Sequence, residues 1–66
     1  MKFKVFINER TVGKKILDDI EKWLKDDGRE YRTEFFMGKN VVFQASKKEL
    51  KQFGVWDESY NPSIHI

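Results

Sequence analysis

The sequence has no cysteine, one proline and one histidine among its 66 residues. Without cysteine it forms neither a disulfide nor a thiolate metal site, and the single His65 does not make a His-rich site. A domain of this length buries only about 60% of the surface that its unfolded chain exposes, so it usually needs a further source of stability. We therefore expect no metal and no cofactor, and instead dense aromatic packing, oligomerisation or a partner.

Long apolar runs are also missing. No segment approaches the roughly 20 apolar residues of a membrane-spanning helix, and we expect no signal peptide. The chain is therefore predicted to be cytoplasmic and to have no membrane partner. Its net charge of +2 and isoelectric point of about 9.0 are only mildly basic and do not by themselves indicate nucleic acid.

What the chain does contain is aromatic residues, with six Phe, two Trp and two Tyr, and clear periodicity. Residues 2–7 alternate with period two, which predicts a strand. Residues 12–27 place apolar side chains at helical spacing opposite a charged side, which predicts a helix that packs one face on a sheet. Thr11 is the expected N-cap of this helix and Gly28 its expected C-terminal stop.

Residues 29–46 change to extended alternation, which predicts two strands joined by a turn at Gly38-Lys39-Asn40. A three-residue loop pairs Phe35 with Phe43 and sets apolar side chains opposite apolar ones. A two-residue loop would slip the strands by one and turn every side chain to the wrong face. The burial pattern therefore favours the longer loop.

The remaining residues predict a second helix and a last strand. Ser46 and Glu49 form a capping box, so a short helix is expected over 47–53, and the alternation of residues 64–66 predicts an edge strand. The expected fold is a single α+β domain over 1–66 with the order β-α-β-β-α(-β). A three- or four-stranded, mostly antiparallel sheet is covered on one face by helix 12–27. Six aromatic residues are expected in its core: Phe3, Trp23, Tyr31, Phe35, Phe43 and Phe53.

The sequence offers little for catalysis. A nucleophile needs a positioned base, and the only histidine is the penultimate residue. The adjacent carboxylates Asp18-Asp19 and Asp26-Asp27 fall on the solvated side or at the end of the predicted helix, where nothing apolar shifts a pKa. The glycines are isolated, so they do not form a phosphate-binding loop. We therefore predict a protein that is not an enzyme.

The second face of the predicted sheet is more informative, because no helix is expected to cover it. It presents a mixture of cations and aromatic rings: Lys2, Lys4, Phe6, Arg32, Glu34, Phe36, Val42 and Gln44. Three interpretations stay open. The tail covers this face with Trp56 or Tyr60, or a protein or second copy covers it, or single-stranded nucleic acid binds there through stacking and phosphate contacts.

The acidic and aromatic segment after the second helix is a further candidate. An exposed Trp and Tyr rimmed by acids have the composition of an interface hot spot, although Trp56 is equally suited to anchor the tail to the core. We predict a small binding module that regulates or inhibits a cellular protein, in the manner of small viral accessory proteins. Its candidate partner-binding residues are Phe6, Phe36, Trp56, Asp57, Glu58 and Tyr60.

Two alternative functions remain. The first is a nucleic-acid-binding regulator that uses the cations Lys2, Lys4, Arg32, Lys47, Lys48 and Lys51. The second is a structural subunit of a homo-oligomer, possible because a small sheet leaves an edge and a face for a second copy. The partner's identity is not encoded in any motif of the chain.

Overall fold

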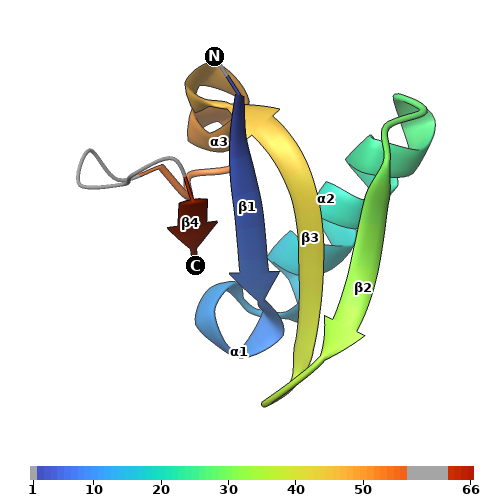
Figure 1. The fold of residues 1–66 in the computed structure, drawn as a ribbon, viewed down its shortest axis with the longest axis vertical. Coiled ribbons are helices and arrows are strands. Elements are labelled where there is room, and N and C mark those ends of the chain that lie inside the picture. The colour runs from blue at the N-terminus through green and yellow to red at the C-terminus, as the bar shows by residue number, and fades with distance from the viewer. Residues whose placement is uncertain (1, 57–62) are drawn as a thin grey trace.

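The computed structural model describes residues 2–56 and 63–66, with the side chain of residue 63 left out. The predicted contacts Asp57, Glu58 and Tyr60 therefore lie outside the described residues. The elements follow in the order β1 (Lys2–Asn8), α1 (Glu9–Val12), α2 (Lys14–Asp26), β2 (Tyr31–Phe35), β3 (Lys39–Ser46), α3 (Lys47–Gln52) and β4 (Ser63–His65) (Figure 1). The α+β class and the final strand are both confirmed.

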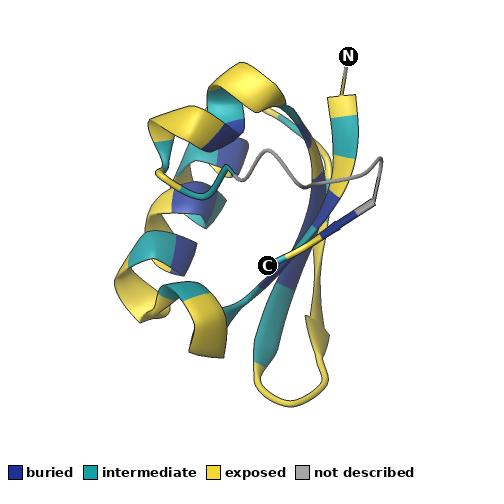
Figure 2. Cartoon of the chain, turned by 90° about the vertical axis from the view of Figure 1, so that its left-hand side faces the viewer, coloured by how far each residue is buried: buried dark blue, intermediate teal, exposed yellow. Residues whose placement is uncertain are grey.

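The four strands form one mixed sheet in the order β2-β3-β1-β4. β3 pairs antiparallel with both β1 and β2, whereas β4 runs parallel to β1. The helices lie on one side of this sheet, and the buried residues lie between the two layers (Figure 2). The core is built from Val5, Ile7, Leu17, Ile20, Leu24, Val41, Phe43, Ala45, Leu50 and Ile64.

The predicted helix 12–27 is wrong at its start. The helical segment begins at Glu9 and is interrupted at Gly13, whose φ of 89° suits glycine and separates α1 from α2. Thr11 is not the N-cap. Asn8 caps α1 instead, its side chain accepting a hydrogen bond of 2.8 Å from the Arg10 backbone N–H. The apolar stripe of α2 packs as predicted because its spacing depends only on the local sequence.

The predicted hairpin register is also wrong. Phe35 pairs with Lys39, and Phe43 pairs with Tyr31, so the loop consists of residues 36–38 rather than 38–40. The strands are displaced by an even number of residues, which keeps every side chain on its predicted face. The displacement carries Phe35 beyond the helix-covered part of the sheet, and this predicted core residue is 79% exposed. The other predicted core aromatics are buried in the core or packed at its edge.

α3 and β4 complete the core. The capping box is confirmed, since the Ser46 hydroxyl accepts from the Glu49 N–H at 3.3 Å and the Glu49 carboxylate accepts from the Ser46 N–H at 2.8 Å. β4 is an edge strand as expected and places Ile64 in the core. The Ile66 N–H donates to the Phe6 carbonyl at 2.8 Å, which continues the pairing beyond β4.

Candidate functional site

The most exposed apolar side chains of the described residues are consecutive. Phe35, Phe36 and Met37, named here the hairpin tip, are 79%, 75% and 67% exposed at the end of β2 and in the loop that follows. An isolated exposed apolar residue is ordinary, but contiguous ones mark candidate contact surfaces. The hairpin tip is therefore the first surface to consider.

Two asparagines hold the hairpin tip from the inside. Asn8 Nδ2 donates to the Met37 carbonyl at 3.2 Å, and Asn40 Nδ2 donates to the carbonyls of Phe36 at 2.9 Å and Gly38 at 3.3 Å. The Phe36 N–H donates to the Gly38 carbonyl at 3.0 Å and closes the loop. Every carbonyl of the loop thus accepts a hydrogen bond, so the apolar side chains project from a fixed backbone.

The backbone at the hairpin tip is also restricted. Met37 has a φ of 54°, which costs a residue with a side chain of order 1 kcal/mol or more. Gly38 has a φ of 103°, and a Cβ there would lie 3.2 Å from Arg10 Cγ. α1 therefore closes the inner side of the loop, which directs the apolar side chains outward.

An ion pair joins the base of the hairpin tip to α2. Lys39, the first residue of β3, pairs with Glu21 of α2, and both side chains are largely buried. The hydrogen bond to Glu21 raises the pKa of Lys39, although burial acts in the opposite direction. The cation next to the apolar cluster is thus already neutralised within the chain.

The predicted aromatic face is partly covered at Phe6. The Phe6 ring stacks on His65 with centroids 4.6 Å apart and planes inclined by 1°, and Lys4 Nζ lies 5.3 Å from its centroid. The C-terminal strand thus covers part of Phe6. The placement of Phe36 on this face stays a prediction, because Phe36 follows the end of β2 and lies in the loop, where it is 75% exposed.

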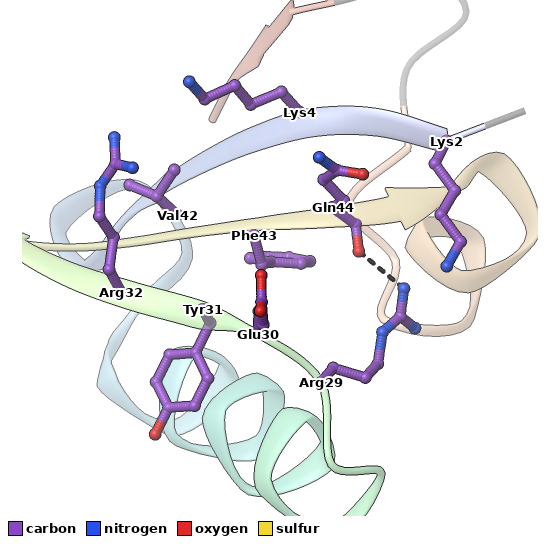
Figure 3. Close-up of a pocket in the computed structure, with 9 residues that line it drawn as sticks. All are labelled: Lys2, Lys4, Arg29, Glu30, Tyr31, Arg32, Val42, Phe43 and Gln44. Atoms are coloured by element: carbon purple, nitrogen blue, oxygen red, sulfur yellow. Dashed lines mark hydrogen bonds between the residues drawn. The ribbon is translucent and has the colours of Figure 1, made fainter.

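A basic hollow of about 690 Å³ lies over β2 and β3 on this face, partly rimmed by cations (Figure 3). Arg32 pairs with Glu34 at 2.6 Å, and Arg29 pairs with Glu49. Lys2 and Lys4 remain as lining cations that have no carboxylate partner among the described residues. The lysines of α3, Lys47, Lys48 and Lys51, do not line the hollow.

Arg29 has a structural role beside this hollow. Its guanidinium donates to the Gln44 carbonyl at 2.7 Å and lies 4.5 Å from the centroid of the Trp23 ring. Burial disfavours the charged form of Glu49, but hydrogen bonds from Arg29 and Ser46 outweigh it, so the pKa of Glu49 lies below its ordinary value. Arg29 therefore connects α2, β3 and α3 and contributes little free charge.

Trp56 is half-buried at the edge of the core. Its ring lies against Phe3 with centroids 5.4 Å apart, and Lys47 Nζ is 5.4 Å from the centre of the indole. The chain after α3 is therefore attached to the helix side of the sheet through this side chain. A contact of Trp56 with a partner stays a prediction.

The described residues include no group of three or more His, Cys, Asp or Glu placed to hold a metal ion. Within the same residues, no helix has the length and apolarity that a membrane span requires. Comparison with protein-family models, with curated proteins and with solved structures finds no match to this chain. The case for a functional site therefore rests on the arrangement of the residues described above.

Sequence reasoning selected Phe36 but missed its neighbours Phe35 and Met37. A signal was present, because three apolar residues directly before Gly38 break the alternation of a half-buried strand. That break marks the start of the loop. The two asparagines that fix the loop gave no such signal, because Asn8 and Asn40 are far apart in sequence.

Proposed function

We propose that the chain is a small non-enzymatic binding module that regulates or inhibits a cellular protein by direct contact. The hairpin tip is the observation that carries this proposal. Its three apolar side chains gain nothing from exposure, and no packing within the described residues requires them. A backbone that is already fixed loses little conformational entropy on binding, which favours affinity.

The chemistry of the hairpin tip indicates what it would meet. Two phenyl rings and one thioether fit an apolar pocket, and aromatic anchors in such pockets dominate the energy of many interfaces. The adjacent Lys39 is neutralised by Glu21, so the proposed contact is apolar at its centre. The module would act by occupying a site on its partner, as small viral accessory proteins do.

The test uses the purified chain as bait in an extract of its source cells, followed by reconstitution with the purified partner. The double variant Phe36→Ser/Met37→Ser removes two exposed anchors, and Lys48→Ala is a matched control at another exposed position. We expect the wild type and the control to capture the same protein. The tip variant should bind it about 30-fold or more weakly by calorimetry. Equal affinity of all three chains would refute the proposal.

The second candidate is a nucleic-acid-binding regulator, favoured by the cations at the basic hollow. Lys2 and Lys4 supply charge there, with Arg32 and the α3 lysines Lys47, Lys48 and Lys51 as further contacts. Binding to a labelled single-stranded oligonucleotide should weaken steeply between about 50 and 200 mM salt. Lys2→Glu/Lys4→Glu should abolish it, and no binding at low salt would eliminate this candidate.

A further inference from the structure

β2 is the outer strand of the sheet, with β3 on its inner side (Figure 1). Its outer edge has no strand partner among the described residues. Natural sheets usually protect such an edge with charged side chains (lysine above all), proline, a bulge or a covering segment. The two charges of β2, Arg32 and Glu34, are of opposite sign and pair with each other. The sequence of β2, Tyr-Arg-Thr-Glu-Phe, has neither lysine nor proline, and four of its five residues are exposed.

The direction of the backbone groups in β2 follows from two hydrogen bonds. In an antiparallel pair, successive residues point their N–H and C=O groups alternately toward and away from the partner strand. The Phe36 N–H points inward to the Gly38 carbonyl, and the Gln44 carbonyl points toward the β2 side, where Arg29 caps it. The even-numbered residues of β2 therefore face β3. The odd-numbered residues Tyr31, Thr33 and Phe35 direct their N–H and C=O groups outward.

The side chains of β2 form a symmetric series. Arg32 and Glu34 lie on the open face, whereas Tyr31, Thr33 and Phe35 lie on the helix side, and Figure 3 shows Arg32 and Tyr31 pointing to opposite sides. The order along the strand is aromatic, cation, threonine, anion, aromatic. Reversing this order keeps the aromatic ends and exchanges the two charges, which is what an antiparallel pair of identical strands requires.

We propose that the outer edge of β2 pairs antiparallel with the same edge of a second copy, centred on Thr33. Thr33 of each copy then exchanges two backbone hydrogen bonds with the other, and Tyr31 does so with Phe35 of the second copy. Arg32 lies opposite Glu34 of the second copy in the close, non-hydrogen-bonded position. The two sheets join into one, with both α2 helices on the same side.

The charges select this register. A residue whose N–H and C=O groups point outward can pair only with a residue of the second copy whose groups also point outward. The nearest alternative registers are therefore shifted by two residues from the Thr33-centred one. One of them sets Arg32 opposite Arg32, and the other sets Glu34 opposite Glu34, and like charges directly opposite each other are destabilising. The Thr33-centred register alone among these three satisfies the backbone and sets unlike charges opposite each other.

The dimer also explains the exposure of Phe35. In the single chain Phe35 is 79% exposed, and Arg32 pairs with Glu34 of the same strand. In the dimer Phe35 gains Tyr31 of the second copy as a neighbour. The antiparallel arrangement puts the two hairpin tips at opposite ends of the shared edge, where Phe36 and Met37 stay exposed. The dimer therefore uses Phe35 and leaves Phe36 and Met37 of the hairpin tip for the protein partner proposed above.

The test is sedimentation equilibrium from about 1 µM to 1 mM, because an interface of one strand pair is at the small end of specific contacts. The wild type should dimerise with concentration. Arg32→Glu alone and Glu34→Arg alone should each dimerise at least about tenfold more weakly, since each places like charges opposite one another. A wild type that stays monomeric at 1 mM, or single variants that dimerise as the wild type does, would overturn the proposal.

Mixing the two variants gives the sharper result. An Arg32→Glu chain and a Glu34→Arg chain set unlike charges opposite each other at both 32–34 pairs of the interface, so they should form a heterodimer. Native mass spectrometry with one chain labelled with ¹⁵N separates this species from either homodimer. Circular dichroism checks that each chain is folded, and Phe36→Ser should leave dimerisation unchanged. Absence of the heterodimer, with both chains folded, would refute the Thr33-centred register.

Discussion

Asn8 and Asn40 lie opposite each other on β1 and β3, and Asn8 Nδ2 donates a hydrogen bond of 2.8 Å to Asn40 Oδ1. The same Asn8 side chain accepts from the Arg10 N–H at the start of α1 and donates to the Met37 carbonyl. One amide thus connects the first helix, the central strands and the hairpin tip. The conformation of the exposed loop is set by the sheet beneath it.

Asn40→Ala should loosen the hairpin tip without unfolding the protein. The change leaves the Phe36 and Gly38 carbonyls without their side-chain donor and removes the acceptor of Asn8 Nδ2. The free energy of unfolding should fall by about 1–2 kcal/mol, and amide hydrogen exchange at residues 36–38 should accelerate. Gln52→Ala, an exposed position on α3, is the control. Unchanged exchange at the tip would contradict the role given to Asn40.

Gly38→Ala should destabilise the protein more than Gly28→Ala. Both glycines have positive φ, 103° and 65°, but an added Cβ meets Arg10 only at Gly38 and meets nothing within 4 Å at Gly28. We expect losses of about 2 kcal/mol and about 1 kcal/mol, respectively, in urea unfolding. In an Arg10→Ala background the difference should shrink. Equal losses in both backgrounds would show that the Arg10 contact has no effect.

Acidification should remove part of the stability contributed by Glu49. Its pKa is lower in the folded chain than in the unfolded chain, so its contribution is complete above the unfolded value of about 4.3 and is lost as the pH falls through the folded value. Unfolding free energy measured from pH 7 to pH 2 should therefore fall less steeply in Glu49→Gln than in the wild type. Parallel curves for the two proteins would contradict this assignment.

Ile64→Ala should be the most damaging change in the C-terminal segment. The Ile64 side chain is 1% exposed and pairs in register with Val5. Truncation of such a residue costs about 2–4 kcal/mol in urea unfolding. His65→Ala, its exposed neighbour, removes only the stack on Phe6 and should cost about 1 kcal/mol. A small loss for Ile64→Ala would show that β4 is not docked in solution.

The sequence predicted what depends on local spacing. The apolar stripe of α2, the Ser46–Glu49 capping box and the two faces of each strand all follow from residues that are close together in the sequence. The hairpin register does not, because the predicted and observed registers place the same residues on each face, so the alternation of apolar and polar residues cannot separate them. In the observed register Asn8 and Asn40 donate hydrogen bonds to the carbonyls of loop residues 36–38, contacts that the local sequence does not reveal.

The candidate site was predicted only in part for the same reason. Phe36 was predicted as a contact residue, but the exposure of its neighbours Phe35 and Met37 was not, because it depends on where β2 ends. Phe6 is partly covered by the ring of His65. This contact joins the first and last strands, so no local sequence pattern predicts it. Contacts at such sequence separation become visible only when the strand order is known.

The central position of β1 has a consequence for how the chain folds. β1 is synthesised first, yet both of its neighbours in the sheet, β3 and β4, begin at Lys39 and Ser63. The apolar side chains of β1 therefore have no strand partner until β3 has been synthesised, and only one strand partner until β4 follows. Loops this long must close before any pairing of β1 is rewarded, which slows folding relative to helical proteins of this size. Pairing of β1 on both sides therefore follows the closure of these two loops, and its pairing with β4 follows last in the order of synthesis.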